Sequence, residues 1–319
     1  MADSVADVDA QEGNSSSLQT AKDLFSGAAG GIAQVLIGTT PRPTPSQPKL
    51  TPPPGQPFDI VKVRLQTSTA YPTALSAATS IYRHEGALAF YKGTLTPLLG
   101  IGACVSIQFG AFHAARRYLE DHRHPSLAGT PLSYSQYYLA GAFAGVANSV
   151  LSGPIEHVRI RLQTQPHGAG RLYAGPWDCV RQLRGHGALY RGQAVTVLRE
   201  AQAYGLWFLA FEWMMNADAA RTGTARKEIA SWKVALYGGL AGEALWLGSY
   251  PLDVVKSKMQ TDGFGKGQRY KTMRDCFAQT FRAEGVRGFW KGIGPTLLRA
   301  MPVSAGTFAV VEATMRAIN

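Results

Sequence analysis

Three ten-residue strings with one pattern of residue types occur at equal spacing in this chain. They are PFDIVKVRLQ from Pro57, PIEHVRIRLQ from Pro154 and PLDVVKSKMQ from Pro251, and successive strings begin 97 residues apart. Each string places a proline, an acid, two bases and a glutamine in the same order. Self-similarity at a fixed period indicates repeated copies of one structural unit. We therefore expect the chain to fold as three related units.

Other marks recur in phase with these strings and extend the repeat over nearly the whole chain. A pair of glycines precedes each proline, at 27 and 31, 141 and 145, and 238 and 242. An aromatic residue, a base and a glycine follow each string, as YKG, YRG and WKG. We expect repeats at residues 22–124, 133–220 and 229–319. Residues 1–21 contain acids but no Lys or Arg. They are expected to form a disordered tail, unlike a cleavable transit peptide.

Each unit has the pattern of an apolar helix, a proline, a polar amphipathic stretch and a second apolar helix. The apolar stretches, with the motif attached, reach the length of ~20 residues that a membrane-spanning helix needs. They lie at residues 24–38, 94–119, 134–153, 193–216, 232–250 and 293–318. Polar groups are scattered along these stretches, as expected for helices that face an aqueous cavity. The predicted fold is an all-α membrane protein with six transmembrane helices around a central cavity, and short amphipathic helices at one end.

Composition excludes several classes of protein. With 45% hydrophobic and 17% charged residues, the chain is unlike a disordered protein, and its three cysteines provide no disulfide framework. Cys104, Cys179 and Cys276 lack metal-ligand spacing, and no nucleophile or phosphate-loop pattern appears. We therefore expect no enzyme activity, no metal and no cofactor. The net charge of +11 would suit nucleic acid, anionic lipid or anionic solutes.

The three strings, together with their glycine and aromatic-base-glycine marks, resemble the signature of the mitochondrial carrier family. The resemblance implies a monomeric, multi-pass transporter of the mitochondrial inner membrane with threefold pseudo-symmetry. It also implies one central binding site that is exposed to each side in turn, with both termini toward the intermembrane space. A nucleic-acid-binding protein would explain the charge but not three equally spaced motifs.

The motif prolines Pro57, Pro154 and Pro251 are expected to bend three helices toward a common axis. The acids and bases that follow them would then form a ring of ion pairs that works as the matrix gate. A helix-borne acid and base three residues apart usually make only a surface salt bridge, but three symmetric copies favour the ring. By symmetry the expected pairs are Asp59 with Arg159, Glu156 with Lys256 and Asp253 with Lys62, braced by Gln66, Gln163 and Gln260.

A second, cytoplasmic gate is expected at the other ends of the even-numbered helices, where the sequence is less regular. Of the bases that the family places there, only Arg116 remains in phase, whereas acids remain at Glu212 and Glu312. Glu212 with Arg116 is the best pair that the sequence offers. We expect this gate to be weak and the resting state to open toward the intermembrane space.

The solute site is expected between the gates, about three turns from the cytoplasmic gate. Arg199 and Glu200 lie side by side in an otherwise apolar stretch, where charges are costly and indicate function. They resemble the contact pair of carriers for amino acids and carnitine, and Arg299 resembles a contact arginine of the carnitine branch. The two arginines suit a carboxylate and Glu200 suits an amine, although Arg199 and Glu200 could instead merely pair with helix neighbours. Gln108, Glu243 and Trp246 are expected to line the cavity, with a lipid-facing Trp246 as the alternative.

Three bases followed by glycine at helix starts resemble the family's contacts with cardiolipin, where backbone N–H groups attract phosphate. They are Lys92 with Gly93, Arg191 with Gly192 and Lys291 with Gly292.

Residues 39–55, TTPRPTPSQPKLTPPPG, interrupt the first repeat with seven prolines. Removing them restores the glycine-to-proline spacing of the other repeats. We interpret the segment as a retained in-frame intron, with a genuine loop as the alternative.

The function predicted from the sequence is the exchange of an amino acid or a carnitine or acylcarnitine-type zwitterion across the mitochondrial inner membrane. A carboxylate or oxo-acid exchanger is the alternative within transport, because the arginines would suffice for it. A membrane scaffold without transport is the alternative from another class.

Overall fold

The computed structural model describes residues 55–300, except 69, 93–94, 123–131 and 166–169. The expected tail at 1–21, the first apolar stretch at 24–38 and nearly all of the insert at 39–55 lie outside the described residues. So do most of the sixth apolar stretch, Gly93 and Glu312.

The described residues form helices and no strands. Four helices are long: α5 (Leu95–Asp121), α6 (Tyr134–Thr164), α8 (Gln193–Thr222) and α9 (Ser231–Thr261). Shorter α-helices are α3 (Gly55–Thr67), α4 (Ala74–Glu85), α7 (Pro176–Gly185) and α10 (Met273–Glu284). Short 3-10 helices are η1 (Ala87–Tyr91), η4 (Arg226–Glu228), η5 (Gly265–Gly267) and η6 (Val286–Trp290), and residues 293–300 are helical.

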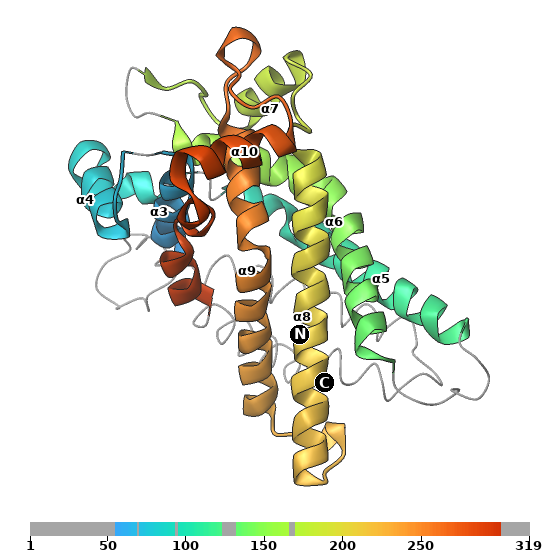
Figure 1. Cartoon of the computed structure of the whole chain (residues 1–319). Helices are drawn as coiled ribbons and strands as arrows, with labels where there is room; N and C mark the ends of the chain where they lie inside the picture. Colours follow the sequence, from blue (N-terminus) through green and yellow to red (C-terminus); the bar gives the residue numbers. More distant parts are fainter. Residues whose placement is uncertain (1–54, 69, 93–94, 123–131, 166–169, 301–319) are drawn as a thin grey trace, which may run out of the picture.

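The element order repeats three times along the chain. A motif helix (α3, α6 or α9) is followed by a surface helix (α4, α7 or α10) and then by a further helix (α5, α8 or residues 293–300). Figure 1 shows α7 and α10 at one end of the molecule, which we call the surface-helix end, with α8 and α9 running away from it side by side. α6 packs along both α5 and α8, and the three motif helices contact one another.

The motif prolines occupy two kinds of position. Pro154 and Pro251 lie inside α6 and α9, which continue past them. Pro57 lies in the first turn of α3, where a proline ring is tolerated. All three helices end at a threonine directly after the motif glutamine, at Thr67, Thr164 and Thr261. The motif therefore occupies the same place, the last turns of its helix, in each repeat.

Glycines allow the backbones of α6 and α8 to approach closely. A Cβ atom on Gly141 would lie 2.6 Å from the carbonyl oxygen of Tyr204, and one on Gly145 would collide with the carbonyl oxygen of Glu200. Small residues at helical spacing are what such close contacts between membrane helices need. This contact sets the position of the Arg199–Glu200 pair along the bundle.

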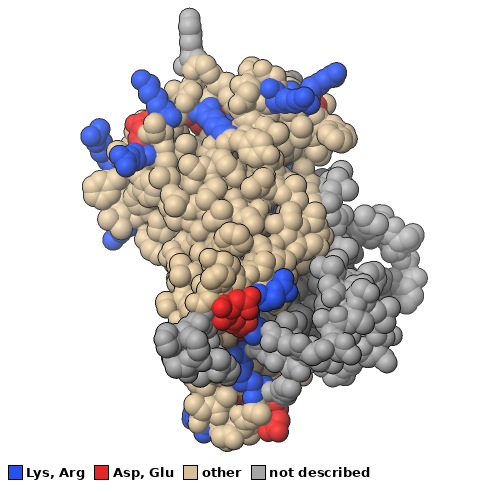
Figure 2. Space-filling model, turned by 90° about the vertical axis from the view of Figure 1, so that its right-hand side faces the viewer, with Lys and Arg blue, Asp and Glu red and all other residues tan. Residues whose placement is uncertain are grey.

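Apolar side chains pack between the long helices and also cover their outer surface. Phe112 of α5 stacks on Phe208 of α8 with ring centroids 3.7 Å apart, and Phe211 packs with Val234 between α8 and α9. Figure 2 shows a broad face that carries no Lys, Arg, Asp or Glu below the charged surface-helix end.

Within the described ranges, no helix combines the length and the apolar character required to cross a membrane.

Candidate functional site

Six charged side chains from the three motif helices meet in a ring. Nη2 of Arg159 lies 2.6 Å from Oδ2 of Asp59, and Nζ of Lys62 lies 2.8 Å from Oδ2 of Asp253. Lys256 pairs with Glu156. The pairs join α3 to α6, α6 to α9 and α9 to α3, so each repeat is linked to both others. These are the partners that the repeat symmetry predicts.

Among the described residues, one of the expected glutamine braces is seen. Nε2 of Gln66 donates a hydrogen bond to Oδ2 of Asp253 at 3.0 Å. Gln163 and Gln260 are buried at corresponding positions, but Nε2 of Gln163 and Oε1 of Gln260 have no hydrogen-bond partner in the part of the chain that the structure describes. The three ion pairs of the ring therefore follow the threefold symmetry, whereas the hydrogen bonds from the glutamine side chains do not.

Two aspartates of the ring also contact the arginines that we expected in the solute site. Nε of Arg199 lies 3.5 Å from Oδ1 of Asp253, and Nε of Arg299 lies 3.1 Å from Oδ1 of Asp59. Both contacts are ion pairs without hydrogen-bond geometry, since neither buried Nε atom has a hydrogen-bond partner among the described residues. Each of these aspartates is therefore shared between a motif base and a second cation.

Arg199 and Glu200 form an ion pair in the interior of the molecule. Both side chains are buried, and an N–H of the Arg199 guanidinium donates to Oε1 of Glu200. The Arg199 guanidinium carbon lies 5.1 Å from the centre of the Trp246 ring, and Nζ of Lys62 lies 4.2 Å from it. Trp246 therefore faces the charged cluster, which removes the lipid-facing alternative for this side chain.

The two other expected liners lie on α5 and α9. Gln108 is buried on α5, and Glu243 is half-buried on α9, three residues before Trp246 and so on a neighbouring part of the same helix face. Oε1 of Glu243 is buried without a hydrogen-bond partner in the described ranges.

The opposite end of the molecule differs from our expectation. Glu212 pairs with Arg226 at 2.8 Å, and Arg116 pairs with Glu120 one turn further along α5, also at 2.8 Å. The expected pair was Glu212 with Arg116. Arg226 is available because α8 ends at Thr222 and η4 brings the chain back toward Glu212. Glu312 lies outside the described residues.

The bases that we expected to contact lipid are tied to acids. Lys92 pairs with Glu85 at 2.6 Å, Arg191 with Asp262 at 2.5 Å, and Lys291 with Glu284. Gly192 and Gly292 have positive φ angles of 79° and 84°, which allow the chain to turn into the following helix. Gly93 is outside the described residues.

Repeats one and three share a second arrangement of charges on the side of the ring nearest the surface helices. Glu85 accepts hydrogen bonds from both Arg64 and Lys92, and Glu284 pairs with both Lys258 and Lys291. Burial alone would raise the pKa of the Glu85 carboxyl, but hydrogen bonds from Arg64 and Lys92 and their charges lower it from 4.5 to about 2. The pKa of Glu284 is lowered for the same reasons.

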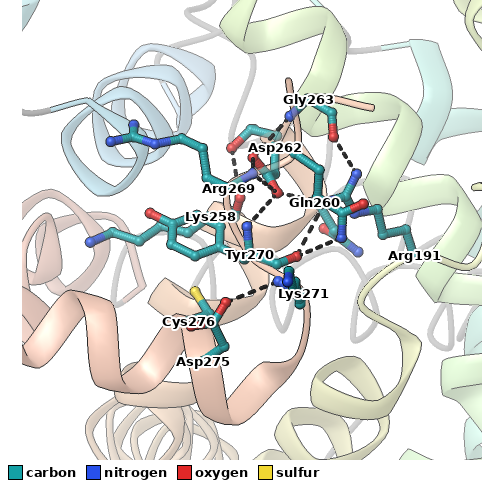
Figure 3. A network of polar contacts seen from close by, with 12 residues as sticks. Arg191, Lys258, Gln260, Asp262, Gly263, Arg269, Tyr270, Lys271, Asp275 and Cys276 are labelled. Carbon is teal, nitrogen blue, oxygen red and sulfur yellow. Dashed lines mark hydrogen bonds and ion pairs between the residues drawn. The ribbon is translucent and has the colours of Figure 1, made fainter. Parts of the chain in front are cut away.

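Repeat two lacks this acid, because His186 stands where the other repeats have glutamate, and Asp262 of repeat three takes part of its place. Asp262 binds Arg191 and accepts hydrogen bonds from the backbone N–H groups of Gly263, Arg269 and Tyr270, at 2.9 to 3.1 Å (Figure 3). Sequence analysis missed Asp262. The missing acid of repeat two was the signal that a substitute was needed, but nothing in the sequence indicated where.

Three segments of the chain match the family described as "Mitochondrial carrier protein", at residues 55–123, 130–217 and 227–319. The "Mitochondrial glycine transporter YMC1" of Saccharomyces cerevisiae is 45% identical over 300 residues, which cover 93% of this chain and 92% of the relative. The "Glutamate/glycine mitochondrial carrier ymc1" of Schizosaccharomyces pombe is 44% identical over 309 residues, or 94% and 96% of the two chains.

A human relative, the "Mitochondrial basic amino acids transporter", is 38% identical over 302 residues, which cover 92% of this chain and 90% of the relative. The names of these three relatives describe carriers or transporters of amino acids. The similarity extends over nearly the full length of both chains in each comparison.

Proposed function

Since this chain belongs to the mitochondrial carrier family, we propose that it carries an amino acid across the inner mitochondrial membrane by alternating access. As a member of that family it is a multi-pass protein of this membrane and a transporter of small solutes. The names of its relatives support amino acids as the solute class. The individual solute, and an obligatory exchange of solutes, are parts of the proposal.

The observation that carries this proposal is the pair of arginines that contact the ring, Arg199, which is buried, and Arg299, which is half-buried. Arg199 and Arg299 each have a buried Nε–H that makes no hydrogen bond among the described residues. A guanidinium binds a carboxylate through two parallel hydrogen bonds, so the solute carboxylate can bind where these donors are unused. Glu200, next to Arg199, supplies the negative charge that an ammonium group requires.

The same contacts suggest how binding would open the ring, which we assign as the matrix gate. A solute carboxylate that binds Arg199 or Arg299 competes with Asp253 or Asp59 for that arginine. The aspartate is then paired only with the base of the motif, Lys62 or Arg159. Burial of the aspartate carboxylate becomes less favourable as a result. Because a buried ion pair gains little net free energy over its desolvation cost, this loss can shift the equilibrium toward the open ring.

The orientation follows from this assignment. All three ring pairs are formed, so the structure corresponds to the state that is closed toward the matrix. The pairs Glu212–Arg226 and Arg116–Glu120 lie at the opposite end, which we assign to the intermembrane space. We further propose that a cardiolipin phosphate binds the backbone N–H groups at the helix starts after Lys92, Arg191 and Lys291.

Uptake into liposomes that contain the purified protein tests the proposal. The solutes are glycine, glutamate, lysine, carnitine, acylcarnitine and a dicarboxylate without an amine. We expect uptake of amino acids, and Glu200→Gln should weaken transport of amine-bearing solutes selectively. The matched control is Glu228→Gln, which removes the same charge from an exposed position on η4. Equal loss for the plain dicarboxylate would refute an amine-binding role for Glu200.

One observation favours a carboxylate or oxo-acid exchanger as the second candidate. Glu200 already pairs with Arg199, so its charge is neutralised before a solute binds. If that pair stays intact during transport, Arg299 would bind the solute carboxylate alone. Uptake of dicarboxylates that is unchanged in Glu200→Gln, without uptake of amino acids, would support this candidate.

A further inference from the structure

A pocket of about 340 Å³ lies at the surface-helix end, beyond the ion-pair ring. Thr67, Thr164 and Thr261, the last residues of the three motif helices, all line it. Its ten lining residues among those that the structure describes include two arginines, Arg64 and Arg161, and no Asp or Glu. The volume is in the range of small-molecule sites, and the lining favours an anion.

Arg161 is a buried cation that contacts neutral groups. Nε lies 2.9 Å from Nε2 of His157, Nη1 lies 3.2 Å from the hydroxyl of Tyr173, and Nη2 donates to the carbonyl oxygen of Asp262 at 2.8 Å. Its guanidinium carbon also lies 4.2 Å from the centre of the Phe264 ring. Within the described part of the chain, no carboxylate lies within ion-pair distance of it.

The corresponding bases of the other repeats are neutralised directly. Arg64 pairs with Glu85, and Lys258 pairs with Glu284. The substitute acid of repeat two, Asp262, directs its carboxylate to Arg191 and to three backbone N–H groups (Figure 3). It offers Arg161 only its carbonyl oxygen. A buried charge is costly unless it is paired, so Arg161 would gain from an anion in the adjoining pocket.

We propose that this pocket binds a small oxyanion, a carboxylate or a phosphate, with Arg161 as its main anchor. Arg161 and Arg64 come from different repeats, so a bound anion would link the ends of α6 and α3. It would bind best when the ring is closed and would therefore oppose opening. The site lies on the other side of the ring from Arg199, and it goes beyond the proposed function, because it does not depend on which solute is carried.

The first experiment measures phosphate binding to the purified full-length protein at constant ionic strength, with chloride as the balancing anion. We expect Arg161→Gln to weaken phosphate binding about tenfold or more, as the loss of a charge-assisted pair of hydrogen bonds implies. The matched control, Arg181→Gln, removes the same charge from an exposed position on α7 at the same end. Equal dissociation constants in both variants would overturn the proposal.

A second series keeps the test decisive if Arg161→Gln does not fold. Leu172 lines the pocket but is 64% exposed, so its replacement leaves the packed interior intact. Leu172→Lys should bind phosphate more tightly than Leu172→Gln, and Leu172→Glu should bind it least, with a several-fold difference at each step. Identical binding in the three variants would exclude this pocket as the site.

Two further measurements distinguish a carboxylate from a phosphate as the ligand, and the pocket from the proposed solute site. Acetate and glutamate are titrated beside phosphate, and competition by either shows that the pocket accepts a carboxylate. Phosphate binding should survive Arg199→Gln, which alters the proposed solute site. Binding that is lost in Arg199→Gln and retained in Arg161→Gln would overturn the pocket assignment, whereas a failure to take up amino acids would affect only the proposed function.

Discussion

Repeats one and three neutralise their charges locally, whereas repeat two depends on its neighbour. In repeat one, Glu85 lies between Arg64 and Lys92, and all three residues belong to the same repeat. In repeat two, Arg191 is paired through Asp262, which follows the motif helix of repeat three. The comparison teaches that threefold symmetry is kept in the ring, where all three repeats must meet, and is relaxed outside it.

This difference has a mechanical consequence. A local triad ties a surface helix to the motif helix of its own repeat and to the base before the following helix, and so makes that repeat a unit. The Asp262 network instead ties the start of α8 to the loop between α9 and α10 (Figure 3). Outside the ring, repeats two and three are therefore linked by an ion pair, whereas Arg64 of repeat one reaches repeat two only through hydrogen bonds of 3.4 Å to the carbonyl oxygen of Gln163. This asymmetry can be tested.

Asp262→Ala should have the largest effect. The change removes the partner of Arg191 and the acceptor for the N–H groups of Gly263, Arg269 and Tyr270. Breaking a buried pair by removing one partner costs about 3–5 kcal/mol. We expect a loss of this order in the free energy of unfolding, measured by denaturation of the purified protein. Asp121→Ala at the exposed end of α5 is the control, and a similar loss there would show that the network is unimportant.

Glu85→Gln and Glu284→Gln should have smaller and similar effects. Each change leaves two bases without their carboxylate, but both acids are only half-buried, so water can solvate part of the exposed charge. We expect each to lower the free energy of unfolding by about 1–3 kcal/mol. A large difference between the two values would contradict the equivalence of repeats one and three.

The ring partners could be predicted because symmetry leaves little choice. Asp59, Glu156 and Asp253 hold equivalent positions beside equivalent bases, so convergence of the helices decides their partners. Asp262 could not be predicted, because it has no counterpart in the other repeats and acts across a repeat boundary.

The same limit applies to the end of the molecule opposite the surface helices. Arg226 lies in a short loop element out of phase with the repeat, so a search for in-phase bases selected Arg116 for Glu212 instead. The orientation of Trp246 depended on packing against Lys62 and Arg199, which periodicity alone does not determine.

Acid should weaken repeat one through Glu85. Its folded-state pKa is lowered from 4.5 to about 2, so the stability that it contributes is fully present above pH 4.5 and is lost as the pH falls toward 2. The free energy of unfolding should decrease over this window, and less steeply in Glu85→Gln. Parallel pH profiles for the two proteins would show that the Glu85 triad does not contribute.

His186→Glu should have the smallest effect on the free energy of unfolding, and it tests the difference between the repeats most directly. In repeats one and three a glutamate precedes a glycine of positive φ, Gly86 or Gly285, and in repeat two His186 precedes Gly187, which also has a positive φ. His186→Glu therefore gives repeat two the acid that the other repeats have. His186 is exposed, so the change alone should alter stability by less than about 0.5 kcal/mol.

In the background of Asp262→Ala, the new carboxylate should partly replace the lost partner of Arg191. A double-mutant cycle over His186→Glu and Asp262→Ala should therefore give a favourable coupling of about 1 kcal/mol in the free energy of unfolding. His186→Gln provides the control, because it adds a side chain of similar size without the charge. Coupling that is zero, or equal for Glu and Gln, would mean that Asp262 supports the loop through its backbone contacts alone and does not substitute for the missing acid.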